Sequence, residues 1–346
     1  MFFKQFYDNN LSQASYLVGC QRTGEAIIID PVRDLTKYME VADSEGFTIT
    51  QAAETHIHAD FASGIRDVAE QLNANVYVSG EGDDELSYRN MPEQTHFVKH
   101  QDIIHVGNIK LEVLHTPGHT PESISFLLTD EGGGSSVPMG LFSGDFVFVG
   151  DIGRPDLLEK SVQMEGSTEV SAKQMYQSIE SVKDLPDYIQ IWPGHGAGSP
   201  CGKALGAVPM STLGYEKINN WAFNVTDESK FVETLTSNQP APPHHFAQMK
   251  KINQFGMNMY QPYDVFPSLD NARIAFDLRS KEAFHGGHTE GTINIPYNQN
   301  FINQIGWYLD YENSIDLIGD KSTVEQAAHT LQLIGFDNVA GYRLPK

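Results

Sequence analysis

The sequence predicts an α/β protein built from two domains, and three observations lead to this class. The chain has 346 residues, about twice the length of a typical domain of roughly 150 residues. Short apolar runs of strand length alternate with segments whose apolar residues recur at helical spacing. A proline-rich break covers residues 239–245, and a second α/β pattern begins near Asp264. We therefore expect one domain over residues 1–240, a linker over 241–261 and a second domain over 262–346.

The elements of the first domain follow from local patterns. Apolar runs bounded by turn residues predict strands over residues 15–19, 26–29, 48–53, 76–79, 109–115, 123–128 and 188–192. A helix is expected over 61–74, because Ile65, Val68, Ala69 and Leu72 form one apolar face. Further helices are expected over 170–182, over most of 209–238 and over 246–255.

Composition narrows the classes of function. The chain carries 23 Lys and Arg against 45 Asp and Glu, a net charge of −22. This balance argues against nucleic acid and against anionic membranes, because both attract basic surfaces. The two cysteines, Cys20 and Cys201, exclude a disulfide-stapled secreted scaffold. With no apolar segment at the N-terminus and no membrane-length run, we expect a cytoplasmic protein.

Histidine and aspartate cluster at the ends of four predicted strands. The first cluster contains His56, His58 and Asp60, and the others contain His119, Asp145 and His195. Alone, the first pair of histidines is also compatible with a polar surface loop. Together, the four strand ends predict one metal site, because imidazole and carboxylate groups that converge there are typical metal ligands.

These residues resemble the signature of the metallo-β-lactamase superfamily, which is HxHxDH followed by a distal His, an Asp and a final His. The resemblance covers about the first 240 residues and implies an αββα sandwich with the metal at one edge. The last His of HxHxDH is Phe61 in this chain. In hydrolytic members that histidine binds a second metal, and a phenyl ring does not coordinate. We therefore predict a mononuclear site.

A closer resemblance, to the persulfide dioxygenases of this superfamily, is carried by Thr-Pro-Gly-His119-Thr, Gly-Asp145 and Asp-Ile-Gly-Arg154-Pro-Asp. It implies one Fe(II) held by His56, His119 and Asp145, a facial triad with open positions; zinc is the less expected metal. His58 and Asp60 are then candidate catalytic groups, and His195 is a group that hydrogen-bonds the ligands. For Asp60 and His195 an ordinary hydrogen-bonding role in a polar cleft stays open.

Two cations and one thiol complete the candidate site. Arg154 and Lys203 are expected to bind an anionic thiol substrate, although a structural pairing of Arg154 with Asp151 or Asp156 is the alternative. Cys201 lies in Gly-Ser-Pro-Cys-Gly-Lys, a segment resembling metallo-β-lactamase–rhodanese fusions. We hypothesise a catalytic thiol with a lowered pKa that accepts or positions sulfur; simple packing is the alternative.

The second domain resembles rhodanese. The resemblance rests on Asp277-Leu-Arg279 and on the segment from Gly287 to Pro296. A working rhodanese needs a cysteine at a helix N-terminus, and no cysteine follows Cys201. We therefore expect a structural or docking role. Some fusions carry a further rhodanese domain with a cysteine, so one alternative is a chain that ends before it.

Taken together, the resemblances imply a non-heme iron persulfide dioxygenase of sulfide metabolism. The enzyme would oxidise the terminal sulfur of a low-molecular-weight persulfide with O2, giving sulfite, or thiosulfate when a sulfurtransferase step follows. The alternative enzyme is a zinc-dependent hydrolase of the glyoxalase II type, and a non-catalytic sulfur-carrier scaffold is the alternative of another class. We expect a homo-oligomer.

Overall fold

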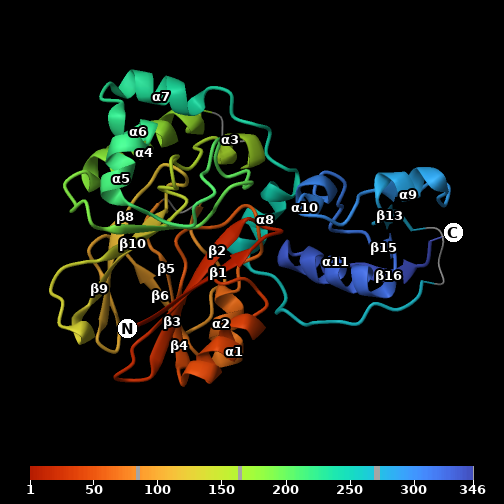
Figure 1. Cartoon of the computed structure of the whole chain (residues 1–346), viewed down its shortest axis with the longest axis horizontal. Helices are drawn as coiled ribbons and strands as arrows, with labels where there is room; N and C mark the ends of the chain where they lie inside the picture. The colour runs from red at the N-terminus through yellow and green to blue at the C-terminus, as the bar shows by residue number, and fades with distance from the viewer. Residues whose placement is uncertain (83–85, 163–165, 269–272, 346) are drawn as a thin grey trace.

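The computed structural model describes residues 1–82, 86–162, 166–268 and 273–345. Two six-stranded sheets form the N-terminal part of the chain, and a four-stranded sheet forms a separate C-terminal unit (Figure 1). None of the described helices is long and apolar enough to cross a membrane. The fold class predicted from the sequence, an α/β sandwich followed by a smaller α/β unit, is confirmed.

The first sheet has the order β1 to β6, with antiparallel pairing up to β3 and parallel pairing after it. Its strands are Phe2–Asp8, Gln13–Gly19, Glu25–Ile29, Thr48–Ala53, Asn75–Ser79 and Thr95–Val98. The second sheet has the order β12-β11-β10-β9-β8-β7. Its strands, in chain order from β7, are Ile103–Val106, Ile109–His115, Ile124–Asp130, Gly140–Gly144, Gln190–Pro193 and Ser211–Thr212.

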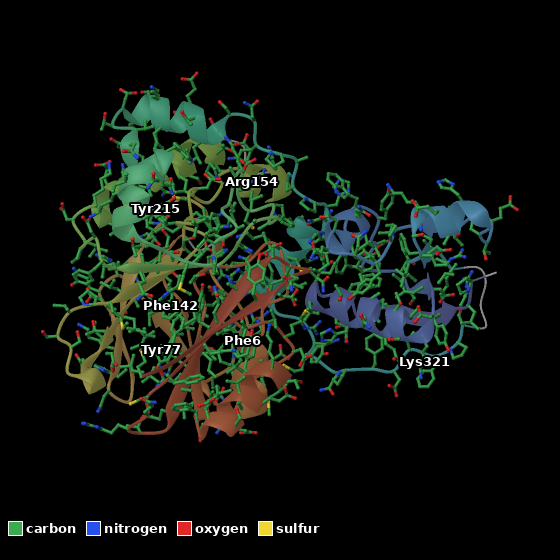
Figure 2. All side chains as sticks on the ribbon, viewed as in Figure 1. Phe6, Tyr77, Phe142, Arg154, Tyr215 and Lys321 are labelled. Atoms are coloured by element: carbon green, nitrogen blue, oxygen red, sulfur yellow. The ribbon has the colours of Figure 1, made fainter. Side chains whose placement is uncertain are left out.

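The two sheets pack face to face because their strands are apolar on both sides. Val18 of β2 and Phe142 of β10, the latter labelled in Figure 2, belong to the core between the sheets. Their neighbours Leu17 and Leu141 belong to two other cores, which hold the outer helices. Successive strand residues point to opposite faces, so each sheet buries one face against the other sheet and one against helices.

Helices cover the outer faces of the sandwich. The first sheet carries α1 and α2, and the second carries α4 to α7. The helices of the N-terminal part and the linker are Thr36–Glu45, Ile65–Leu72, Leu157–Val162, Ser167–Val182, Leu213–Asn219, Trp221–Asn224, Glu228–Thr236 and His245–Phe255, numbered α1 to α8.

The C-terminal unit has a parallel sheet of order β14-β13-β15-β16. In chain order from β13 its strands are Ala275–Asp277, Ile293–Asn294, Ile315–Ile318 and Val339–Arg343, and its helices α9 to α11 are Lys281–Gly286, Phe301–Ile305 and Lys321–Leu333. It is attached to the sandwich by polar contacts. Arg33 donates to both carboxylate oxygens of Asp337, at 3.0 and 3.1 Å, and the Ala62 N–H donates to the Leu333 carbonyl at 2.8 Å.

Two local predictions differ from the structure. The helix predicted over 61–74 begins only at Ile65, because residues 61–63 bond to α8 and α11 instead of continuing a helix. A Cβ on Gly64 would lie 2.2 Å from the Val32 carbonyl oxygen, so the turn needs glycine. Strand β1 was not predicted from the sequence, and its residues are only half-buried at the edge of the sheet.

Candidate metal centre

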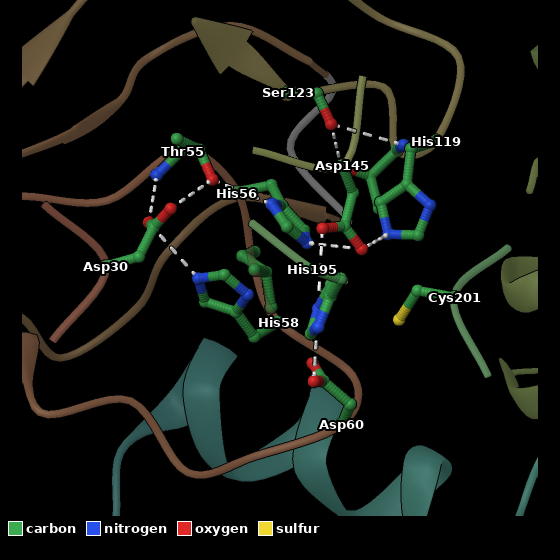
Figure 3. A network of polar contacts seen from close by, with 12 residues as sticks. Asp30, Thr55, His56, His58, Asp60, His119, Ser123, Asp145, His195 and Cys201 are labelled. Carbon is green, nitrogen blue, oxygen red and sulfur yellow. Dashed lines mark hydrogen bonds and ion pairs between the residues drawn. The ribbon is translucent and has the colours of Figure 1, made fainter. Parts of the chain in front are cut away.

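The candidate site lies where strands of both sheets end. Asp145 follows β10 and His195 follows β11, and these two strands are parallel neighbours. Strand β8, which precedes His119, runs in the same direction, because it pairs antiparallel with β9 as β10 does. The segment from His56 to Asp60 follows β4 of the first sheet. Figure 3 shows these side chains converging.

Three buried residues form a first group, the first triad: His56, His119 and Asp145. Their ligand atoms all lie within 4.8 Å of one another. The Nε2 atoms of His119 and His56 lie 3.4 and 3.8 Å from Oδ2 of Asp145. None of these facing atoms has a hydrogen-bond partner among the described residues. Buried polar atoms are normally satisfied, so the first triad fits a metal ion.

The opposite nitrogen of each imidazole is held by the protein. His119 Nδ1 lies 3.0 Å from the Arg154 carbonyl oxygen and must donate to it. His56 Nδ1 lies 2.9 Å from Thr55 Oγ1, which gives its own proton to Asp30. Both rings therefore present an unprotonated Nε2 to the first triad. Burial lowers the pKa of both histidines well below the usual value, which keeps them neutral.

A second buried group, the second triad, contains Asp60, His195 and Cys201, whose ligand atoms also lie within 4.8 Å of one another. His195 Nε2 lies 3.2 Å from Asp60 and 3.4 Å from Asp145, and so it borders both groups. Burial raises the pKa of the Cys201 thiol well above its usual value. The lowered pKa expected from the sequence was therefore wrong, because the thiol is shielded from water.

His58 directs its Nε2 toward carboxylates that belong to neither group, and the catalytic role suggested by the sequence stays a prediction. Its Nε2 lies 3.2 Å from Asp30 and 3.8 Å from Glu54. Burial opposes protonation, yet these carboxylates raise the pKa of His58 to about 9. The ring also packs against Phe61, with centroids 4.4 Å apart. These contacts fix the position of the His58 ring within the metal-ligand segment.

The two cations expected to bind substrate are bound to the protein itself. Arg154 is fully buried and forms a bidentate pair with Asp156, with both contacts at 2.8 Å. Its remaining donors reach the carbonyls of Pro200 and Pro240. These contacts match the alternative prediction, in which Arg154 pairs with Asp156 as a structural residue. They hold the loops around the site. Lys203 donates to carbonyls at the end of α7.

Sequence reasoning missed the residues of α8 that hold the metal-ligand segment. The peptide of Ile57, between His56 and His58, donates to Glu122 at 3.0 Å and accepts from Lys250. Asn253 donates to the carbonyls of His58 and Phe61. These α8 partners lie more than 190 residues away in sequence, and no local signal marks them.

The family model described as the metallo-beta-lactamase superfamily matches residues 8–195. The chain therefore belongs to the metallo-β-lactamase superfamily, a class of enzymes whose fold holds a metal site at this sheet edge.

Particular relatives give a finer comparison. A crystal structure described as a metallo-beta-lactamase from Staphylococcus aureus subsp. aureus COL is 73% identical, with a TM-score of 0.96, and covers 100% of this chain and 99% of its own. ETHE1 from Myxococcus xanthus is 28% identical, with a TM-score of 0.59, over 73% of this chain and 98% of its own. A hydroxyacylglutathione hydrolase from Dictyostelium discoideum is 29% identical over 71% of this chain and 82% of its own.

Proposed function

We propose that this protein is an iron-dependent persulfide dioxygenase. The observation that carries the proposal is the composition of the first triad together with Phe61. Two imidazoles and one carboxylate, with positions left open, are typical of mononuclear non-heme iron oxygenases. Phe61 is fully buried beside His58, at the position where hydrolytic members of the superfamily carry a second-metal histidine.

The proposed reaction consumes a thiol persulfide, O2 and water and yields the free thiol, sulfite and two protons. The terminal sulfur is oxidised and both oxygen atoms of O2 are reduced. Bound at the first triad, Fe(II) would supply the activation of O2. The protein fixes the ligand rings through Thr55 and the Arg154 carbonyl. Burial of the surrounding side chains excludes bulk water from the reacting atoms.

The substrate class we propose is a low-molecular-weight persulfide such as that of glutathione or coenzyme A. The buried thiol of Cys201 lies beside Asp60 and His195, and in this proposal it positions or accepts the sulfur of the substrate. The thiol carrier itself would remain in solvent, because the described site is lined by groups that are almost fully buried.

A zinc-dependent thioester hydrolase is the second candidate, favoured by the similarity to the hydroxyacylglutathione hydrolase. In that reaction Asp60 would orient a hydrolytic water. The two candidates differ in what they consume. A hydrolase uses no oxygen, and a dioxygenase does not require a thioester.

The test compares both reactions on the same preparation. The protein is loaded with Fe(II) or with Zn²⁺, the metal content is measured by mass spectrometry, and oxygen uptake is followed with glutathione persulfide and coenzyme A persulfide. We expect uptake with Fe(II), sulfite as product and no uptake after His119→Ala. An Fe(II)-loaded protein that consumes no oxygen with either persulfide, while the zinc form hydrolyses a hydroxyacyl thioester of glutathione, would overturn the proposal.

A further inference from the structure

The two histidines of the first triad come from different sheets. His56 follows β4 of the first sheet, and His119 follows β8 of the second. Their rings are nearly perpendicular, at 89°, with centroids 4.8 Å apart, and Figure 3 shows them on either side of the Asp145 carboxylate. Pairing within one sheet does not set this distance. It depends on bonds between the two ligand segments, of which one is a backbone bond from the Ile124 N–H to the Thr55 carbonyl at 2.9 Å.

Glu122 supplies a side-chain bond between the same two segments. It lies three residues after His119, in the loop between β8 and β9. Its carboxylate accepts the Ile57 N–H at 3.0 Å. This N–H belongs to the peptide group that links Ile57 to His56. The loop that carries one histidine ligand is therefore bonded to the backbone directly beside the other.

Lys250 of α8 bonds to the other side of Ile57. Its ammonium group donates to the Ile57 carbonyl, which belongs to the peptide group that links Ile57 to His58. Glu122 and Lys250 are only 2% and 7% exposed. Burial lowers the pKa of Lys250, and Glu122 is the strongest of the nearby groups that oppose this shift. Charge-assisted hydrogen bonds in such surroundings are stronger than bonds between neutral groups, so both peptide groups are firmly held.

We propose that Glu122 and Lys250 are positioning residues of the metal centre, which set the orientation of His56 relative to His119 through the backbone of Ile57. Together they join the second sheet, the ligand segment of the first sheet and the linker helix α8. Loss of either bond would free the backbone that directs the His56 ring toward the first triad. The proposal rests on the first triad holding a metal ion, and it applies whichever reaction that metal serves.

The magnitude follows from the role of supporting bonds at metal centres. Groups that hold a metal ligand in place typically change metal affinity by about 10–100-fold when they are removed. Glu122 and Lys250 act through a peptide group rather than on the ring itself. We therefore expect an effect of about tenfold, at the lower end of this range.

The experiment separates the position of His56 from the charges of the two side chains. The metal-free full chain is titrated with Co²⁺ against a chelator, because the visible absorption bands of bound cobalt report the geometry of its ligands. Glu122→Ala removes the acceptor, Glu122→Gln keeps an oxygen acceptor without the charge, and Lys250→Met removes the donor. The matched controls, Glu169→Gln and Lys173→Met, break an exposed ion pair of 2.6 Å on α4.

Glu122→Ala and Lys250→Met should each weaken Co²⁺ binding by about tenfold and shift its absorption bands. Glu122→Gln should keep the wild-type bands even if urea unfolding shows a lower stability, because its amide oxygen still accepts the Ile57 N–H. Both controls should match wild type in affinity and bands.

Wild-type affinity and bands in Glu122→Ala or in Lys250→Met would overturn the positioning role, and so would equal band shifts in Glu122→Gln and Glu122→Ala. Circular dichroism establishes that each variant is folded, and Lys250→Met decides the question if Glu122→Ala does not fold. Because these readouts need neither persulfide nor oxygen, their failure is distinct from failure of the proposed dioxygenase activity.

Discussion

Replacing Asn253 with alanine should destabilise the protein and loosen the segment that carries Asp60. The Asn253 amide nitrogen donates to the carbonyls of His58 and Phe61, at 2.9 and 2.7 Å. Its amide oxygen accepts the Ser63 N–H at 2.9 Å. One side chain of α8 therefore satisfies three backbone groups on both sides of Asp60.

The expected cost follows from these three bonds. A buried polar group that loses its partner costs about 1–3 kcal/mol. The three costs are not additive, since water enters the space that the amide leaves and satisfies part of the set. We therefore expect Asn253→Ala to lower the free energy of unfolding by about 3 kcal/mol. We also expect a weaker metal affinity, because the freed segment begins at His58, two residues after the candidate metal ligand His56.

Urea unfolding followed by circular dichroism, together with competition against a metal chelator, would measure both effects. The matched control is Asn219→Ala, which removes one exposed bond of 3.2 Å to the Tyr215 carbonyl and should change stability by less than about 0.5 kcal/mol. If Asn253→Ala unfolds at the same urea concentration as this control and binds metal equally well, α8 does not hold the segment and our reasoning is refuted.

Three further predictions concern neighbouring parts of the structure. Arg154→Met should cost about 2–3 kcal/mol in urea unfolding, because the buried Asp156 carboxylate loses its bidentate partner and keeps only Lys160, at 2.7 Å; an unchanged midpoint would show that the pair is dispensable. Gly153→Ala should weaken metal binding in chelator competition, because the new Cβ would lie 1.9 Å from the Asp145 carbonyl oxygen; wild-type affinity would contradict this. Burial raises the pKa of Asp67 to about 6, so Asp67 destabilises the fold increasingly as pH rises from its unfolded pKa of about 4 to about 6, and the cost is constant above that. Asp67→Asn should therefore be more stable than wild type by about 1–3 kcal/mol at about pH 7 to 8 and nearly equal to it at about pH 3; a gap that stays constant with pH in urea titrations would contradict it.

The strand-end residues of the site were predictable because local signals locate them. Each of His119, Asp145 and His195 follows an apolar run and lies in a glycine-containing turn. Those runs become β8, β10 and β11, which point the same way in one sheet. Sequence patterns fix where such a strand ends, and parallel direction then brings the ends together.

Contacts that depend on distant packing were not predictable. The helix over 245–255 was expected from its sequence, but nothing in that pattern shows that Lys250 and Asn253 would bond to the segment around Ile57. The partner of Arg154 was likewise not predictable from its local sequence. Its local motif suggested either substrate or an aspartate as partner, and the full burial that favours Asp156 arises only when the loop of Pro200 closes over it.

The positions of three cations, Arg154, Lys203 and Lys250, bear on how the C-terminal unit is related to the candidate metal centre. The persulfide substrate that we propose is anionic and would approach a protein with a net charge of −22. The two cations expected to bind it, Arg154 and Lys203, are bound to partners within the protein. Lys250 is buried, and burial lowers its pKa, whereas the nearby Glu122, Asp145, Cys201 and Asp60 oppose that shift.

Lys250 belongs to α8, the helix that also meets the C-terminal unit. A Cβ on Gly306 of that unit would lie 2.1 Å from the ring of His245 on the same helix. Displacement of the C-terminal unit would therefore move the helix that carries Lys250. On this argument the C-terminal unit has a structural role, because it contacts the helix whose Lys250 bonds to the peptide of Ile57.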